Sequence, residues 1–196
     1  MTDQDKNRHL IEKYPFLLPR NVWTDAEVED FDFSYCLIKD DIPEGWWKFF
    51  GEVLCEDLKE VLVKHKYLDE FRILQCKEKF GELRLYDNGH PEEWYDHLVA
   101  WEYISAHTCC SCGKFPVPMM TTGWISPYCE DCFVNIYPSA KNDLKSYLLE
   151  PDFDGRLHEY TGYYRFTEDG KELHLIDLKP FYRKLGVSVK NLIPYD

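Results

Sequence analysis

Two CxxC pairs constrain the folding of this chain more than any other feature of its sequence. Cys109 and Cys112 form the first pair, Cys129 and Cys132 form the second, and the 16 residues 113–128 separate them. One CxxC turn lets two thiolates reach the same ion, and two such turns supply the four ligands of a tetrahedral zinc site. The spacing therefore predicts that residues 108–134 form a zinc-ribbon-like module around one structural Zn²⁺.

The residues between the two pairs suit this interpretation. Gly113 permits the backbone turn in which amide groups point at sulfur, and Pro116, Pro118 and Gly123 favour a short hairpin that brings the second pair alongside the first. Two alternatives use the same side chains, namely an iron–sulfur cluster and a redox-active CxxC pair. A redox-active site needs only one CxxC pair, so it does not explain the second pair. Zinc and an iron–sulfur cluster use the same four ligands, and spectroscopy distinguishes them.

The other cysteines are expected to be reduced and inert. The chain has eight cysteines, no N-terminal secretory signal, and no apolar run near the roughly 20 residues that cross a bilayer. These features predict a cytoplasmic protein that is not in the membrane. In the reducing cytoplasm, cysteines serve metal binding rather than disulfides. Cys36, Cys55 and Cys76 are expected to be small buried side chains, and Cys110 an inert neighbour of the first CxxC turn.

Hydrophobic periodicity predicts an α+β fold, with amphipathic helices and β-hairpins around an aromatic core. An apolar stripe with a 3.6-residue period predicts a helix from Pro43 to about His65, and a second helix is expected over residues 91–105. Two hairpins are expected over residues 71–89 and 163–176, with turns at 80–81 and 169–170. Shorter helices are predicted over 138–150 and 180–185. The aromatic content of 16 % suits a core of large rings.

The pattern is less informative at the N-terminus and in the first hairpin. Residues 1–40 are expected to be an ordered but irregular arm, with a short strand at 31–35. Both faces of residues 71–80 mix apolar and charged side chains, which leaves open which face is buried. The resulting organisation is an α+β part over 1–107, the zinc module over 108–134, and a helix and hairpin part over 135–196, within one compact unit.

The charge of the chain disfavours contact with nucleic acid. Asp and Glu number 36 against 23 Lys and Arg, which gives a formal net charge of −13. Lys114 is the only Lys or Arg between residues 105 and 134, and four thiolates on one Zn²⁺ add a net charge of about −2. Phe115, Trp124 and Tyr128 are suited to stacking on bases. A nucleic-acid-binding ribbon therefore remains an alternative, although the segment has no cluster of Lys and Arg that would bind phosphates.

Three segments together resemble a group of uncharacterised bacterial and phage proteins. These proteins combine a KEKFG-x-LR-x-Y segment, found here within residues 75–86, with a CxxCGK…GW…CxxC pair of zinc knuckles, found here from Cys109 to Cys132. The likeness extends to the Pro-x-Gly-Trp helix start at residues 43–46. It implies a zinc-binding cytoplasmic protein of phages and mobile elements. The group has no established activity, so the resemblance implies no catalytic residue.

Two nuclease patterns offer an enzymatic alternative. An HNH nuclease needs a histidine after its first knuckle, and no histidine lies between Cys112 and Cys129. Asp152, Asp169 and Lys171 have the composition of a Mg²⁺-dependent nuclease core, but Asp169 and Lys171 fall at a predicted hairpin turn. We therefore predict a non-catalytic, zinc-stabilised acidic protein that acts by binding another macromolecule, for example as an inhibitor of a basic nucleic-acid-binding protein; a protein partner is expected. The alternatives are a metal-dependent nuclease and a nucleic-acid-binding ribbon.

Overall fold

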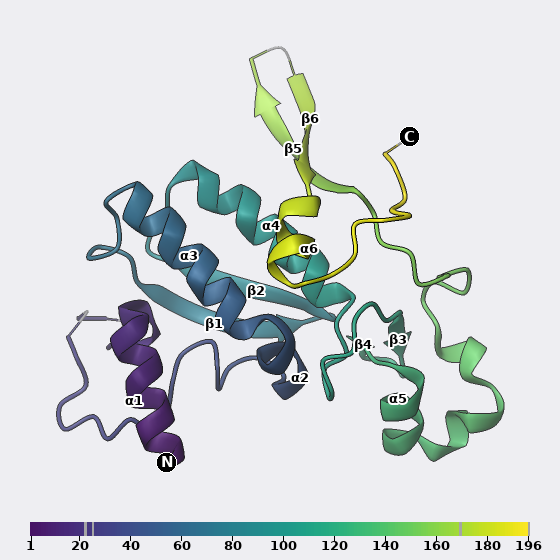
Figure 1. The fold of residues 1–196 in the computed structure, drawn as a ribbon, viewed down its shortest axis with the longest axis horizontal. Coiled ribbons are helices and arrows are strands. Elements are labelled where there is room, and N and C mark those ends of the chain that lie inside the picture. Colours follow the sequence, from purple (N-terminus) through teal and green to yellow (C-terminus); the bar gives the residue numbers. More distant parts are fainter. Residues whose placement is uncertain (22, 25, 169, 196) are drawn as a thin grey trace.

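The computed structural model describes residues 1–21, 23–24, 26–168 and 170–195, and it confirms the α+β fold class (Figure 1). The helices are α1 (Asp3–Lys13), α2 (Glu44–Trp46), α3 (Glu52–Lys64), α4 (Glu92–Ala106), α5 (Glu130–Ile136) and α6 (Lys179–Lys184). The strands are β1 (Ile73–Lys79), β2 (Glu82–Asp87), β3 (Met119–Thr121), β4 (Ile125–Pro127), β5 (Tyr160–Thr167) and β6 (Gly170–Asp177). Each odd-numbered strand pairs antiparallel with the strand that follows it.

A nearly continuous helical run follows Pro43, as the sequence predicts. Helix α2, a π-helical turn over Trp47–Gly51 and helix α3 succeed one another in the chain. The π turn inserts one extra residue, and a Cβ on Gly51 would overlap the Trp47 ring. The large side chains of the buried face are four residues apart along the run: Trp46, Phe50, Leu54 and Leu58.

The first hairpin turns where the sequence predicts. Phe80 and Gly81 both have positive φ, 55° and 83°, as the two-residue turn of a tight hairpin requires. A bulge between Ile73 and Gln75 adds one residue to β1, so that Ile73 and Cys76 both face the core. A regular strand would place these two side chains on opposite faces. The bulge therefore explains why the alternation in the sequence left the buried face open.

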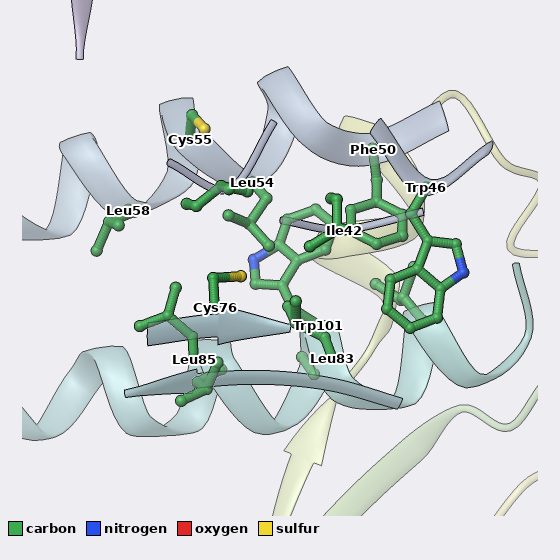
Figure 2. Close-up of a cluster of buried hydrophobic side chains, with 14 of the residues drawn as sticks. Ile42, Trp46, Phe50, Leu54, Cys55, Leu58, Cys76, Leu83, Leu85 and Trp101 are labelled. Atoms are coloured by element: carbon green, nitrogen blue, oxygen red, sulfur yellow. The ribbon is translucent and has the colours of Figure 1, made fainter. Parts of the chain in front are cut away.

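The main core lies between α3, the β1–β2 hairpin and α4 (Figure 2). Leu54 and Leu58 of α3 point toward Cys76 and Leu85 of the hairpin. Trp101 of α4 enters the same space and stacks on Phe50, with 5.7 Å between ring centroids. Trp46, Trp94 and Trp101 are fully buried, which confirms the predicted aromatic core.

The N-terminal part differs from the prediction of an irregular arm. Residues 3–13 form α1, and a capping box starts it, because Thr2 and Asp5 each bond the backbone amide of the other. The prediction of a strand at 31–35 is also wrong. Phe33 has a φ of 61°, which an extended strand does not allow, and it packs against Phe31 and the core instead.

The C-terminal part contains the predicted hairpin and final helix. The β5–β6 hairpin projects from the rest of the chain (Figure 1). The Asp96 carboxylate of α4 holds its base by accepting hydrogen bonds from Tyr163 Oη at 2.8 Å and His174 Nε2 at 3.0 Å. Of the predicted turn at 169–170, Asp169 lies outside the described residues, and Gly170 has a φ of 131°.

The single helix predicted over 138–150 is wrong. Two short 3₁₀ helices, Pro138–Asn142 and Leu144–Tyr147, occupy this stretch, and Asp143 interrupts them with a φ of −151°. The Ser146 hydroxyl donates to the Asp143 carbonyl at 3.0 Å, which competes with a helical backbone bond at that group. Among the helices of the described ranges, none combines the length and the apolar character that a membrane span requires.

Candidate metal centre

The structure brings the four predicted thiols together. The Sγ atoms of Cys109, Cys112, Cys129 and Cys132 all lie within 4.8 Å of one another. Cys129 Sγ is 3.8 Å from Cys109 Sγ and 3.7 Å from Cys112 Sγ. A regular tetrahedron with Zn–S bonds of about 2.3 Å has edges of about 3.8 Å. The cluster therefore has the composition and the spacing of a four-thiolate zinc site.

The first CxxC turn is closed by its own backbone. The amide of Gly113 donates to the carbonyl of Cys109 at 3.0 Å, and Gly113 has the positive φ, 79°, that this turn requires. Burial opposes ionisation of Cys109, but hydrogen bonds from the backbone amides of Cys129, Cys112 and Ser111 outweigh it and lower the pKa of this thiol. Backbone amides therefore favour the thiolate that a metal would bind.

The second CxxC turn begins helix α5. Cys129 is the residue before the helix and Cys132 lies in its first turn, while the short β3–β4 hairpin returns the chain from the first pair. This hairpin confirms the prediction for residues 113–128. Burial first, and then the neighbouring thiol groups, raise the pKa of Cys132. Four thiolates repel one another at this distance, and a divalent cation would remove that penalty.

The first CxxC turn is packed directly on the start of the helical run. The amide of Gly45 donates to the Cys110 carbonyl at 2.8 Å, and Trp46 Nε1 donates to the Thr108 carbonyl at 2.7 Å. A Cβ on Gly45 would overlap the Cys109 carbonyl oxygen and lie 2.6 Å from the Gly113 nitrogen. Residue 45 must therefore be glycine for these two backbones to meet, a role that the Pro-x-Gly-Trp pattern alone did not reveal.

The remaining cysteines lie outside the cluster. Cys36, Cys55 and Cys76 are buried in the main core, which confirms their interpretation as small buried side chains, and Cys110 beside the first CxxC turn is buried there as well. Figure 2 shows Cys55 and Cys76 within that core. Burial raises the pKa of Cys36 to about 12 and raises that of Cys110 as well. These thiols are protonated at neutral pH and are poor ligands and nucleophiles.

Two of the three aromatic residues that are suited to stacking on bases are used in packing. Phe115 stacks on Phe49 with 5.0 Å between ring centroids, and Tyr128 packs against the core and Phe133. Trp124 is 58 % exposed, and its ring lies 5.8 Å from that of Phe80 at the tip of the first hairpin. Of the three rings considered for stacking on bases, the ribbon thus leaves only that of Trp124 exposed.

The two described residues of the nuclease alternative, Asp152 and Lys171, are not gathered into one site. Asp152 borders a cavity at the end of α4, whereas Lys171 lies near the tip of the projecting hairpin, with Nζ 4.0 Å from the centre of the Tyr164 ring (Figure 1). Asp169, the remaining member, is outside the described residues. Within residues 1–21, 23–24, 26–168 and 170–195, one group of three or more side chains that could hold a metal ion lies close together, and it consists of the four cysteines.

Comparisons with protein-family models, with curated proteins and with solved structures found no match to this chain. Functional inference therefore depends on the chain's own geometry. The four-cysteine cluster is its clearest chemical feature, since both CxxC turns and their backbone bonds agree with the ligand set that a tetrahedral metal requires.

Proposed function

We propose that the four cysteines hold one structural Zn²⁺ in a non-catalytic protein. The closeness of the four Sγ atoms carries this proposal. Four thiolates fill a tetrahedral coordination sphere, so the ion has no position open to a substrate or an activated water. When bound, the ion would supply the positive charge that lets four thiolates coexist.

The ion would fasten the ribbon to the helical run. Cys109 and Cys112 belong to the turn that contacts Gly45, whereas Cys129 immediately precedes α5 and Cys132 lies in its first turn. A metal bond between the pairs would therefore connect the helical run, the β3–β4 hairpin and α5 through one centre.

Elemental analysis tests the metal. We expect about one zinc per chain in protein purified under reducing conditions, with no visible absorption band of an iron–sulfur cluster. Protein that is folded and free of metal would contradict the proposal. Stoichiometric iron together with sulfide would contradict zinc and identify the site as an iron–sulfur cluster.

The protein is proposed to act by binding a basic protein. The formal net charge is −13, and Glu29, Asp30 and Asp32 are exposed in one short segment. Trp23 lies in the same loop region and is 91 % exposed. An exposed indole and exposed carboxylates in one loop region suit an interface with a cationic surface, because tryptophan supplies contact area and the carboxylates supply attraction. A partner that itself binds nucleic acid, such as a nuclease, has the complementary charge.

The resemblance to phage and mobile-element proteins suggests the setting of this interaction. In that setting, an acidic protein would act as an inhibitor of a basic host or rival enzyme, because it occupies the surface that binds phosphates. The charge of the chain and the exposed acidic segment support this proposal.

Capture with a charge-matched control tests the proposed partner class. We expect the protein to retain basic proteins from cells of its host at low salt and to release them at high salt. The triple variant Glu29→Gln, Asp30→Asn and Asp32→Asn should weaken this capture more than the control Asp69→Asn, Glu70→Gln and Glu172→Gln, which also removes three exposed carboxylates. Mg²⁺-dependent cleavage of nucleic acid that Asp169→Ala abolishes would refute the non-catalytic proposal and favour the nuclease.

A further inference from the structure

A cavity of about 420 Å³ opens beside the end of α4. One wall consists of Tyr103 of α4 and His107, the residue that follows this helix. The loop over residues 150–158 forms the opposite wall, and Ile193 of the C-terminal segment also lines the cavity. Backbone bonds between Ile193 and residues 157 and 159 hold the last two segments together. The cavity thus joins three parts of the chain that are distant in sequence.

Aromatic rings line this cavity. The Tyr103 and His107 rings are stacked, with 4.5 Å between centroids, and Phe153 lies 5.9 Å from His107. The His158 ring stands nearly perpendicular to Tyr103, at 6.2 Å. The four rings border one volume, and a cation over an aromatic face is attracted by the quadrupole of the ring.

Hydrogen bonds fix the rings before any ligand binds. His107 Nδ1 donates to the Tyr103 carbonyl at 2.9 Å, and the backbone amide of His158 donates to Tyr103 Oη at 3.0 Å. Tyr182 Oη donates to the His158 carbonyl at 2.9 Å. Tyr103, His107 and the backbone of His158 are therefore ordered in the free protein, which lowers the entropic cost of binding.

Carboxylates surround the mouth of the cavity. Asp154 accepts a bond from Arg156 Nε at 2.6 Å, so this pair is internally satisfied. Glu150 and Asp152 also line the cavity and are exposed, and neither forms an ion pair with a residue that the structure describes. The rim therefore carries two uncompensated negative charges next to the aromatic rings.

We propose that this cavity binds an arginine side chain of a basic protein partner. The inference rests on the proposed function and assigns it a specific contact. A guanidinium is planar, so it can stack on the rings of Tyr103 or His107 while its N–H groups bond the carboxylates of Glu150 and Asp152. The ammonium group of lysine lacks both the plane and the fork, so the site discriminates between the two cations.

A short peptide with one arginine tests the assignment. We expect acetyl-Gly-Ser-Arg-Ser-Gly-amide to shift the ring proton signals of Tyr103, His107, Phe153 and His158 in NMR titrations. The same peptide with citrulline, which is neutral and nearly isosteric, should leave them unchanged. The double variant Glu150→Gln with Asp152→Asn should weaken arginine binding by about tenfold or more.

A matched control separates the cavity from general acidity. Asp143→Asn with Glu130→Gln removes the same charge from exposed positions outside the cavity and should leave the affinity within about twofold. Equal binding of the citrulline peptide, or of a lysine peptide, would overturn the arginine assignment. So would an unchanged affinity in the Glu150→Gln, Asp152→Asn variant.

The outcome for the cavity is separable from that for the proposed function. If the protein captures a basic partner and the cavity variants capture it equally well, the cavity assignment fails and the proposed function stands. If the arginine peptide occupies the cavity but host capture yields no basic protein, the proposed function fails instead.

Discussion

The contact between Gly45 and the first CxxC turn predicts the effect of one added methyl group. In Gly45→Ala the new Cβ would overlap the carbonyl oxygen of Cys109 and lie 2.6 Å from the Gly113 nitrogen and 2.7 Å from the Cys110 oxygen. All three neighbours are backbone atoms, so no side chain can rotate away. Either the turn or the helical run has to move.

The cost can be worked from three contributions. Overpacking destabilises by about 1–3 kcal/mol, and weakening of the bond from the Gly45 amide to the Cys110 carbonyl adds about 1 kcal/mol. Alanine regains about 1 kcal/mol over glycine within a helix. The net loss in the free energy of unfolding is therefore about 1–3 kcal/mol. For a chain of 196 residues this lowers Tm by about 2–12 °C.

Thermal unfolding and zinc release to a chromogenic chelator measure this effect together. We expect Gly45→Ala to lower Tm and to release metal faster, because the displaced turn carries Cys109 and Cys112. Gly51→Ala is the control, since its Cβ would meet the Trp47 side chain, which lies outside the CxxC turns. Its Tm should fall without faster metal release. Wild-type Tm and release rate in Gly45→Ala would refute the argument that the two backbones are in contact.

Three further predictions concern the thiols and a buried carboxylate. Cys112→Ser should lower the zinc content from about one per chain toward zero and broaden the unfolding transition, as elemental analysis and calorimetry would show. Asp57→Asn should cost about 3 kcal/mol in denaturant unfolding, because Asp57 is buried and accepts bonds from His97, Trp101 and Lys184. Iodoacetamide at pH 8 should leave four thiols unmodified in the native protein by mass spectrometry: Cys36, Cys55, Cys76 and Cys110.

Asp57 also predicts a pH dependence. Burial opposes its ionisation, but the hydrogen bond and charge of His97 and the hydrogen bonds from Lys184 and Trp101 outweigh burial and lower its pKa. A lowered folded-state pKa contributes stability above the unfolded value of about 3.9, and this contribution is lost as the pH falls through the folded-state value. The stability difference between wild type and Asp57→Asn should therefore be constant near neutral pH and shrink below about pH 4.

Each of these predictions has an outcome that contradicts it. Full zinc occupancy in Cys112→Ser would remove this thiol from the ligand set. A stability difference for Asp57→Asn that grows on acidification would show that the carboxyl is neutral in the folded protein. Rapid alkylation of Cys55 in the folded state would contradict its burial.

The elements that the sequence predicts well are those whose signals are local. The CxxC spacing, the stripe from Trp46 to Leu58 and the Phe80-Gly81 turn each depend on residues a few positions apart. The start of α1 was also local, since Thr2 and Asp5 form a capping box, but the helix has few apolar side chains and its periodicity is weak.

Other features depend on insertions or on distant neighbours. The bulge after Ile73 changes which side chains of β1 are buried, and no residue type in the strand predicts a bulge at this position. At the break, Asp143 has an extended φ and its carbonyl accepts the Ser146 hydroxyl, a local bond that competes with a helical backbone bond. Neither outcome follows from hydrophobic periodicity, since periodicity describes regular elements only.

The sequence by itself determined the set of four thiols, because ligand chemistry and turn geometry reside in a few adjacent residues. Only the tertiary structure decided what those thiols join. It placed Gly45 against the backbone of the first CxxC turn, and it brought Tyr103, Phe153 and Ile193 around one cavity. Such contacts depend on how distant segments pack, and packing depends on the shapes of all the elements at once.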